Sequence, residues 1–287
     1  MGAAGQDMNP WTLRGTTVLG ALALACLLAL PARAQGVLLR IRPHVGDTLH
    51  ARLEQQTEVS AVVAGPTGPT TKSVTTSVAI NSRTIVQSAL ATTTLVLTVV
   101  DSAELHTSDT HGAAQVADAE RRLRGQQLVL QLALDGTVET ARDGRGNPVP
   151  RDMAEAMSAM PAIFPQHAVN VGDQWTREMP LPSGGPLGAR GSGQVRATFR
   201  LDSLDRSGDI AFVSMRGDIV PDERSQGVEL TGAVTGNLQL NRARGWMTES
   251  RFSVLVRSLI TPPAATGLAP MRFVTRVTQR LRTMDKR

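Results

Sequence analysis

The chain of 287 residues is long enough for one large domain or two small ones, and 41% of it is hydrophobic, which suffices for a sizeable core. Aromatic residues make up only 3%, with no Tyr, so that core must consist mainly of aliphatic and Met side chains. The formal net charge of +5 is small for this length and does not indicate nucleic-acid binding.

The first 34 residues predict a secretory signal peptide. Arg14 supplies a positive charge, residues 16–30 form an apolar run, and Ala32-Arg33-Ala34 matches the small-x-small cleavage pattern. Because the run is shorter than the roughly 20 residues of a membrane span, we expect cleavage after Ala34 and no transmembrane span afterwards. Lipid attachment at Cys26, the only cysteine, is the alternative. The predicted location is periplasmic or secreted.

Alternating polar and apolar residues predict strands through most of residues 49–134. Leu49, Ala51 and Leu53 would share one strand face, with polar or charged residues between them. β-Branched residues over 92–101 predict a more buried strand. A short charged helix is predicted over 113–124. Asp135-Gly136 then follows an alternating segment and is typical of a hairpin turn.

Residues 150–160 predict the clearest helix of the chain. Pro150 suits a first turn, and Met153, Met157 and Met160 would lie on one helix face at spacings of four and three residues. This methionine stripe either packs on the sheet or forms an adaptable lid over an apolar cavity, because Met side chains can repack around varied ligands. The three methionines are therefore candidate ligand-binding residues.

A Val-Gly-Asp turn occurs twice, at 45–47 and at 171–173, and each copy precedes a predicted strand. Gly tolerates positive φ, and Asp hydrogen-bonds to nearby backbone, so both suit a turn that begins a strand. The repeated turn divides residues 35–287, predicted to be one β-rich exported domain, into two halves that meet near 163. Trp175 follows the second turn. We expect it to be largely buried and include it among the candidate ligand-binding residues.

Long alternating segments continue over 195–201, 210–219, 228–240, 246–260 and 271–283. The segment 228–240 would span about 40 Å at roughly 3.3 Å per residue, longer than a typical sandwich strand. Gly232 and Gly236 interrupt its apolar face, as expected where a strand curves sharply or another backbone approaches closely. The prediction is a mainly β fold, with long antiparallel strands forming a strongly twisted half-barrel or barrel and one or two short helices. Two stacked domains are the alternative.

The stretch from Pro165 to Trp175, with its Val-Gly-Asp-x-Trp motif, resembles an uncharacterised family of exported bacterial β-rich proteins, as does the earlier Val-Gly-Asp turn. This resemblance implies no catalytic residues. The predicted outline of long strands and helix is also similar to the half-barrels of periplasmic lipoprotein carriers. That second resemblance is one of fold alone, and it implies an apolar ligand on the concave face.

Few motifs indicate catalysis. His106 and His111 flank Asp109, but no cysteine or third histidine lies nearby in the sequence, so a polar loop is predicted in place of a metal site. The glycine-rich segment 183–193 lacks the Gly-Lys-Ser/Thr of a phosphate-binding loop and precedes a strand. We therefore predict no catalytic residue, metal site or cofactor, and expect a protein that is not an enzyme.

Arginines share one face of the last predicted strand, at Arg272, Arg276 and Arg280. They either protect an edge strand from pairing with other chains or contact an anionic envelope surface, since guanidinium groups match phosphate well. Nucleic acid fits poorly, because these arginines lack aromatic neighbours for base stacking.

Two functions remain open from the sequence. The first is an exported envelope protein that binds an apolar or lipid-like ligand on the concave face of a β-sheet. The second is a structural or protein-interaction module of the envelope, with an interior filled by its own side chains and no small-molecule ligand. A cavity of several hundred Å³ lined by apolar side chains would favour the first function.

Overall fold

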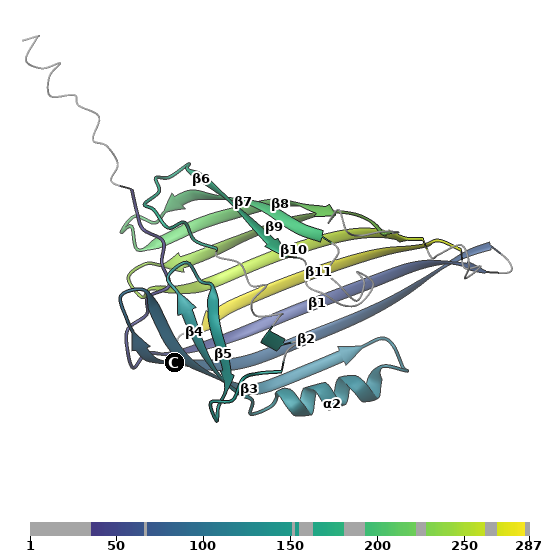
Figure 1. Ribbon diagram of the computed structural model, residues 1–287, viewed down its shortest axis with the longest axis horizontal. Coiled ribbons are helices and arrows are strands. Elements are labelled where there is room, and N and C mark those ends of the chain that lie inside the picture. The colour runs from purple at the N-terminus through teal and green to yellow at the C-terminus, as the bar shows by residue number, and fades with distance from the viewer. Residues whose placement is uncertain are drawn as a thin grey trace, which may run out of the picture. The chain divides into compact units, whose positions relative to one another are not determined.

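Long antiparallel strands make up most of the described chain. The computed structural model describes residues 36–65, 68–150, 153–154, 163–180, 193–221, 228–261 and 269–284 (Figure 1). The elements are β1 (Thr48–Gly65), β2 (Gly68–Ala89), β3 (Thr93–Thr107), α2 (Ala113–Leu123), β4 (Gln127–Ala133), β5 (Val138–Asp143), β6 (Gln174–Pro180), β7 (Gly193–Leu204), β8 (Ile210–Pro221), β9 (Val228–Asn241), β10 (Trp246–Ile260) and β11 (Met271–Met284). The helix predicted over 113–124 is confirmed by α2. None of the described helices is long and apolar enough to cross a membrane.

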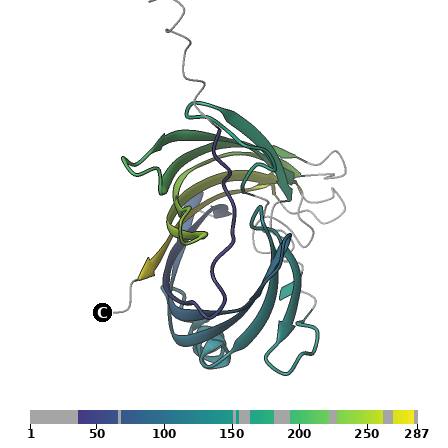
Figure 2. The ribbon, with the colours of Figure 1, turned by 90° about the vertical axis from the view of Figure 1, so that its left-hand side faces the viewer.

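All strands belong to one 11-stranded sheet in the order β5-β4-β3-β2-β1-β11-β10-β9-β8-β7-β6. Strands β1 and β11, from opposite ends of the described chain, pair antiparallel in the middle of the sheet. Strands before and after residue 163 therefore share one sheet. That sheet is open and strongly curled, as Figure 2 shows along the strands. The predicted mainly β half-barrel of long antiparallel strands is confirmed.

The two faces of the sheet differ in burial. Along β7, Val195, Ala197, Phe199 and Leu201 are buried, whereas most of the residues between them are exposed. We call the face that carries these buried residues the core-side face, and the opposite one the outer face. One row across the core-side face comprises Trp175, Phe199, Met215, Gly236, Phe252, Gln279, Gln55 and Val78.

Residues 36–47 form an N-terminal strap that joins distant parts of the sheet. The backbone N–H of Ile41 donates to the carbonyl of Leu134, in the β4–β5 turn, at 2.8 Å. The N–H of Arg42 donates to the carbonyl of Gly245, in the β9–β10 turn, also at 2.8 Å. The strap therefore ties both halves of the sheet together at one end.

Apolar side chains of the strap fill that end of the curl. Leu39 is 0% and Ile41 6% exposed, and Phe164, from the segment before β6, is 1% exposed. All three belong to the same hydrophobic cluster as Leu240 of β9 and Leu132 of β4. In Figure 2 the strap, drawn in purple, lies within the curve of the sheet. The core-side face is therefore the concave one.

The two Val-Gly-Asp turns have the same hydrogen-bonding pattern. Gly46 and Gly172 have φ values of 87° and 96°, a conformation that favours glycine. Their N–H groups donate to the carbonyls of Val86 in β2 and Leu201 in β7, at 2.9 and 2.7 Å. Each turn thus fixes the strand that follows it, β1 or β6, to that strand's hairpin partner. This confirms the predicted turn at the start of both halves.

Candidate functional site

The concave face is filled along β7 to β9 and only partly covered along the central strands. Phe199 and Met215 are 1% and 5% exposed. Their row continues into Phe252 and Val78, which are partly exposed. We call this partly exposed region the inner patch, comprising Leu53, Gln55, Val78, Phe252, Val254, Val277, Gln279 and Leu281.

An open hollow of about 970 Å³ runs across the outer face of the sheet, behind this patch, because most of its lining residues, such as Gln56, Arg251 and Thr278, point to that face. Strands β1, β2, β3, β7, β8, β9, β10 and β11 all contribute to its lining, which mixes apolar and polar residues. It also touches Gln55, Val78, Phe252 and Gln279, whose strands form its floor, but not Leu53, Val254, Val277 or Leu281, so it is separate from the concave surface of the inner patch.

Two glutamines stand among the apolar residues of the inner patch. Gln55 of β1 and Gln279 of β11 lie directly opposite each other in the strand register. The Nε2 of Gln55 donates a hydrogen bond of 3.4 Å to Oγ1 of Thr57. The carboxamide of Gln279 has no hydrogen-bond partner among the described residues. Polar groups are therefore available on the otherwise apolar patch.

Trp175 is buried, as predicted, with 6% of its surface exposed. Its indole Nε1 donates to the carbonyl of Ile163 at 2.8 Å, and its ring stacks on Phe199 with centroids 5.8 Å apart. Strands β7 to β9 separate it from the inner patch. Both its polar and its apolar surfaces are thus used within the core, and its role as a ligand contact stays a prediction.

The predicted methionine helix falls mostly outside the described residues. Met153 is described, and its sulfur lies 3.8 Å from Nε2 of Gln126, which precedes β4. Met157 and Met160 lie outside the described residues. A role of this stripe as a lid stays a prediction.

His106 departs from its predicted setting, because β3 extends through Thr107 and places this histidine within a strand. It contributes to the lining of the hollow. The polar loop begins only after it, and there Oδ1 of Asp109 accepts a hydrogen bond of 3.0 Å from the backbone N–H of His111. Within the described ranges, no group of three or more His, Cys, Asp or Glu side chains is placed to hold a metal ion.

Interpreting the arginine-bearing final strand as an edge strand is wrong. β11 lies at the centre of the sheet, between β1 and β10, because the two ends of the chain pair there. Arg272, Arg276 and Arg280 occupy its outer face. Arg276 lies 4.0 Å from Glu58 of β1, an exposed pair worth little in stability.

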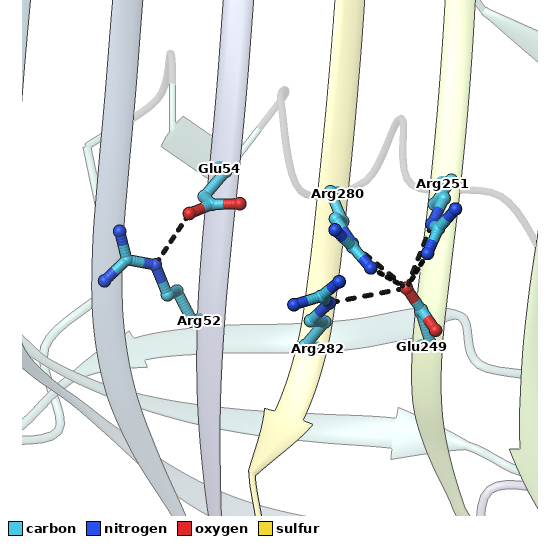
Figure 3. A network of polar contacts seen from close by, with 6 residues as sticks. All are labelled: Arg52, Glu54, Glu249, Arg251, Arg280 and Arg282. Atoms are coloured by element: carbon cyan, nitrogen blue, oxygen red, sulfur yellow. Dashed lines mark hydrogen bonds and ion pairs between the residues drawn. The ribbon is translucent and has the colours of Figure 1, made fainter.

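Arg280 belongs to a network around one carboxylate (Figure 3). Oε1 of Glu249 in β10 lies 2.7 Å from Arg280, 2.8 Å from Arg251 and 3.4 Å from Arg282. Nearby, Arg52 forms an ion pair with Glu54 at 2.8 Å, which brings the group to four arginines and two glutamates. The sequence gives no sign of this network, because Glu249 reaches Arg280 only through the pairing of β10 with β11.

Two aspartates have lowered pKa values, and each stands at the end of a strand, Asp143 closing β5 and Asp205 following β7. The side-chain amide of Asn147 donates to Asp143 and lowers the pKa of that carboxyl group. The backbone N–H of Ile210 does the same for the pKa of Asp205. Both carboxylates accept hydrogen bonds that hold the turn after their own strand. These shifts therefore reflect local turn structure.

An open, curled antiparallel sheet with a partly exposed apolar concave face defines the class of fold. Residues 150–247, about a third of the chain, match a family of unknown function (DUF6263). That match agrees with the resemblance to an uncharacterised family. No curated protein matches the sequence.

Solved structures resemble the chain weakly. A structure of lipovitellin, concerned with lipid–protein interactions, aligns with 84% of this chain at 8% identity and a TM-score of 0.49. The chain spans only 25% of that lipovitellin chain. DynF from the dynemicin biosynthesis pathway of Micromonospora chersina aligns over 89% of this chain and 88% of its own, at 9% identity and a TM-score of 0.23. An outer membrane channel from Pseudomonas putida F1 aligns over 88% of this chain and 99% of its own, at 10% identity and a TM-score of 0.20.

Proposed function

We propose that this chain is an exported, non-enzymatic protein of the cell envelope, periplasmic or secreted, that binds an apolar or lipid-like ligand on the concave face of its sheet. The inner patch is the observation that carries the proposal. Its apolar side chains lie on the central strands, next to a filled core, yet stay partly exposed. Each methylene group of a ligand buried there would contribute about 0.8 kcal/mol.

The position of the patch favours a small ligand over a protein partner. The patch lies on the concave face, and the strap closes one end of the curl. Flat protein surfaces reach such a face poorly, whereas a hydrocarbon chain fits along it. A structural or interaction module with a self-filled interior is the alternative. Such a module would bury Phe252, Val254 and Val277 as fully as Phe199 is buried.

A charge placed on the inner patch should weaken binding strongly. Val277 points to the concave face and is partly buried, whereas its neighbour Thr278 is exposed on the outer face. We expect the wild type to bind the uncharged probe N-phenyl-1-naphthylamine saturably. Val277→Glu should weaken this by about tenfold or more, because an ionised carboxylate resists desolvation beside a hydrocarbon ligand. Fluorescence titration measures the effect.

The matched control is Thr278→Glu, which adds the same charge one residue away on the opposite face. It should change the affinity by less than about twofold. Denaturant melts of both variants check that the fold is kept. Absence of saturable binding by the wild type, or equal losses in both variants, would favour the interaction-module alternative.

The outer face supports a second candidate function, contact with anionic lipid headgroups. Four arginines and two glutamates on three neighbouring strands leave an excess of positive charge there. Arg52 and Arg282 are 44% and 49% exposed, so their guanidinium groups are accessible. Arginine near an anionic membrane surface contributes about 1 kcal/mol.

Removal of two of these charges should weaken binding to anionic vesicles. We expect Arg52→Gln with Arg282→Gln to lower binding to phosphatidylglycerol vesicles by about tenfold at low salt. The control pair Arg216→Gln with Arg257→Gln removes the same charge from other exposed positions of the outer face and should have a smaller effect. Vesicle flotation measures binding, and high salt should abolish it. Binding that ignores salt, or equal losses in both double variants, would contradict this contact.

A further inference from the structure

We infer that Gln55 and Gln279 select the headgroup of the ligand, and that the preferred ligand is a single-chain amphiphile with an uncharged hydroxyl or ester head. The inference rests on the proposed binding of an apolar ligand at the inner patch. It adds the chemistry of the ligand's polar end, which apolar contacts alone leave undefined.

The two carboxamides form a polar point at the centre of an apolar surface. They face each other across the β1–β11 pair, and Phe252 and Val78 continue their row on either side. Leu53 and Leu281 form the next row in one direction, towards the filled end of the curl. A ligand that lies along β11 therefore meets Leu281 on one side of this point, Val277 on the other, and amide groups between them.

The hydrogen-bonding capacity of the pair is largely unused. Gln279 has no partner among the described residues, and Gln55 uses only one donor, towards Thr57. Each carboxamide offers both N–H donors and a carbonyl acceptor. A hydroxyl group also donates and accepts, so it can satisfy both functions, and an ester carbonyl can accept from either amide.

A charged head finds no counter-ion at this point. In the two rows on either side of the glutamines, the core-side residues of β10, β11, β1 and β2 are apolar or hydroxyl-bearing, and the nearest core-side charge on these strands, Lys72, lies three rows away. The arginines of β11 point to the opposite face, where glutamates pair with them. Because a carboxylate or ammonium group buried without a partner is costly, this setting disfavours fatty-acid anions and cationic amphiphiles.

Competition between ligands of equal chain length tests the inference. Monopalmitin and palmitate are each used to displace N-phenyl-1-naphthylamine from the mature protein at alkaline pH, where palmitate is ionised. We expect monopalmitin to displace the probe at concentrations at least tenfold lower than palmitate. Gln55→Leu with Gln279→Leu should keep probe binding but weaken monopalmitin about fivefold to tenfold, the effect of losing a hydrogen bond to a buried head.

Gln56→Leu is the matched control, since Gln56 follows Gln55 on β1 but points to the outer face. It should leave the monopalmitin preference unchanged. Gln279→Lys should reverse the preference, because an ammonium group supplies the missing counter-ion for palmitate.

The outcomes separate the two proposals. If the probe does not bind at all, the proposed function itself fails. If the probe binds and Val277→Glu prevents this, but palmitate competes as well as monopalmitin, only the headgroup inference is overturned. The headgroup inference alone is also overturned if Gln56→Leu weakens monopalmitin as much as the double variant does, or if Gln279→Lys leaves monopalmitin the stronger competitor.

Discussion

Replacement of Trp175 by Ala is expected to lower the free energy of unfolding by about 3 to 5 kcal/mol, the range for deleting a large buried aromatic side chain. The indole is 6% exposed and stacks on Phe199. Its Nε1 also donates to the carbonyl of Ile163, which links β6 to the segment before it. The substitution therefore removes packing and leaves that partly buried carbonyl without its donor. Denaturant unfolding measures the loss.

Trp175→Phe separates the two contributions. Phenylalanine keeps a ring against Phe199 but cannot donate to Ile163. We expect Trp175→Phe to lower the free energy of unfolding by less than Trp175→Ala does, with about 1 kcal/mol of the decrease due to the lost hydrogen bond. A loss under about 1 kcal/mol for Trp175→Ala would contradict a structural role. It would make a ligand contact the better explanation for this residue.

The strands of this fold follow from the sequence, but their order does not. Period-2 alternation is a local property, so residues 195–201 and 228–240 predict strands and their buried faces correctly. Pairing of β1 with β11 joins residues more than two hundred positions apart, and no local pattern encodes it. The interpretation that the arginines of β11 protect an edge strand is therefore wrong, since charged outer-face residues occur equally on a central strand.

The candidate site depends on which core-side residues are covered by other segments, and the alternation of polar and apolar residues in the sequence does not indicate this. Val254 and Leu238 fit the same apolar pattern, yet Leu238 is 1% exposed and Val254 partly exposed. Within the described part of the chain, the strap and the segment before β6 pack on Leu238's side of the concave face, where they share its hydrophobic cluster. One signal was present in the sequence. Gln279 stands between Val277 and Leu281, where an apolar residue continues the pattern.

Gly232 is where the second large effect on stability is expected. A Cβ atom at this position would lie 2.3 Å from the carbonyl oxygen of Leu255 in β10 and 2.6 Å from Cδ1 of Ile219 in β8. The first neighbour is backbone in a paired strand, which cannot move without disturbing the β9–β10 register. The sequence predicts either a sharp curve or a close backbone approach at Gly232 and Gly236, and the structure shows the close approach at both.

Gly232→Ala should therefore lower the free energy of unfolding by about 3 kcal/mol, as expected for overpacking against backbone. Thr231→Ala, at the exposed neighbouring position, is the control and should cost less than about 1 kcal/mol. The sign of the effect is decisive. Without the close approach, Ala would restrict the unfolded chain more than Gly and stabilise the protein by roughly 0.4 to 1 kcal/mol. A denaturant melt in which Gly232→Ala is as stable as the wild type, or more so, would show that β9 and β10 are further apart at this point than the carbonyl of Leu255 requires.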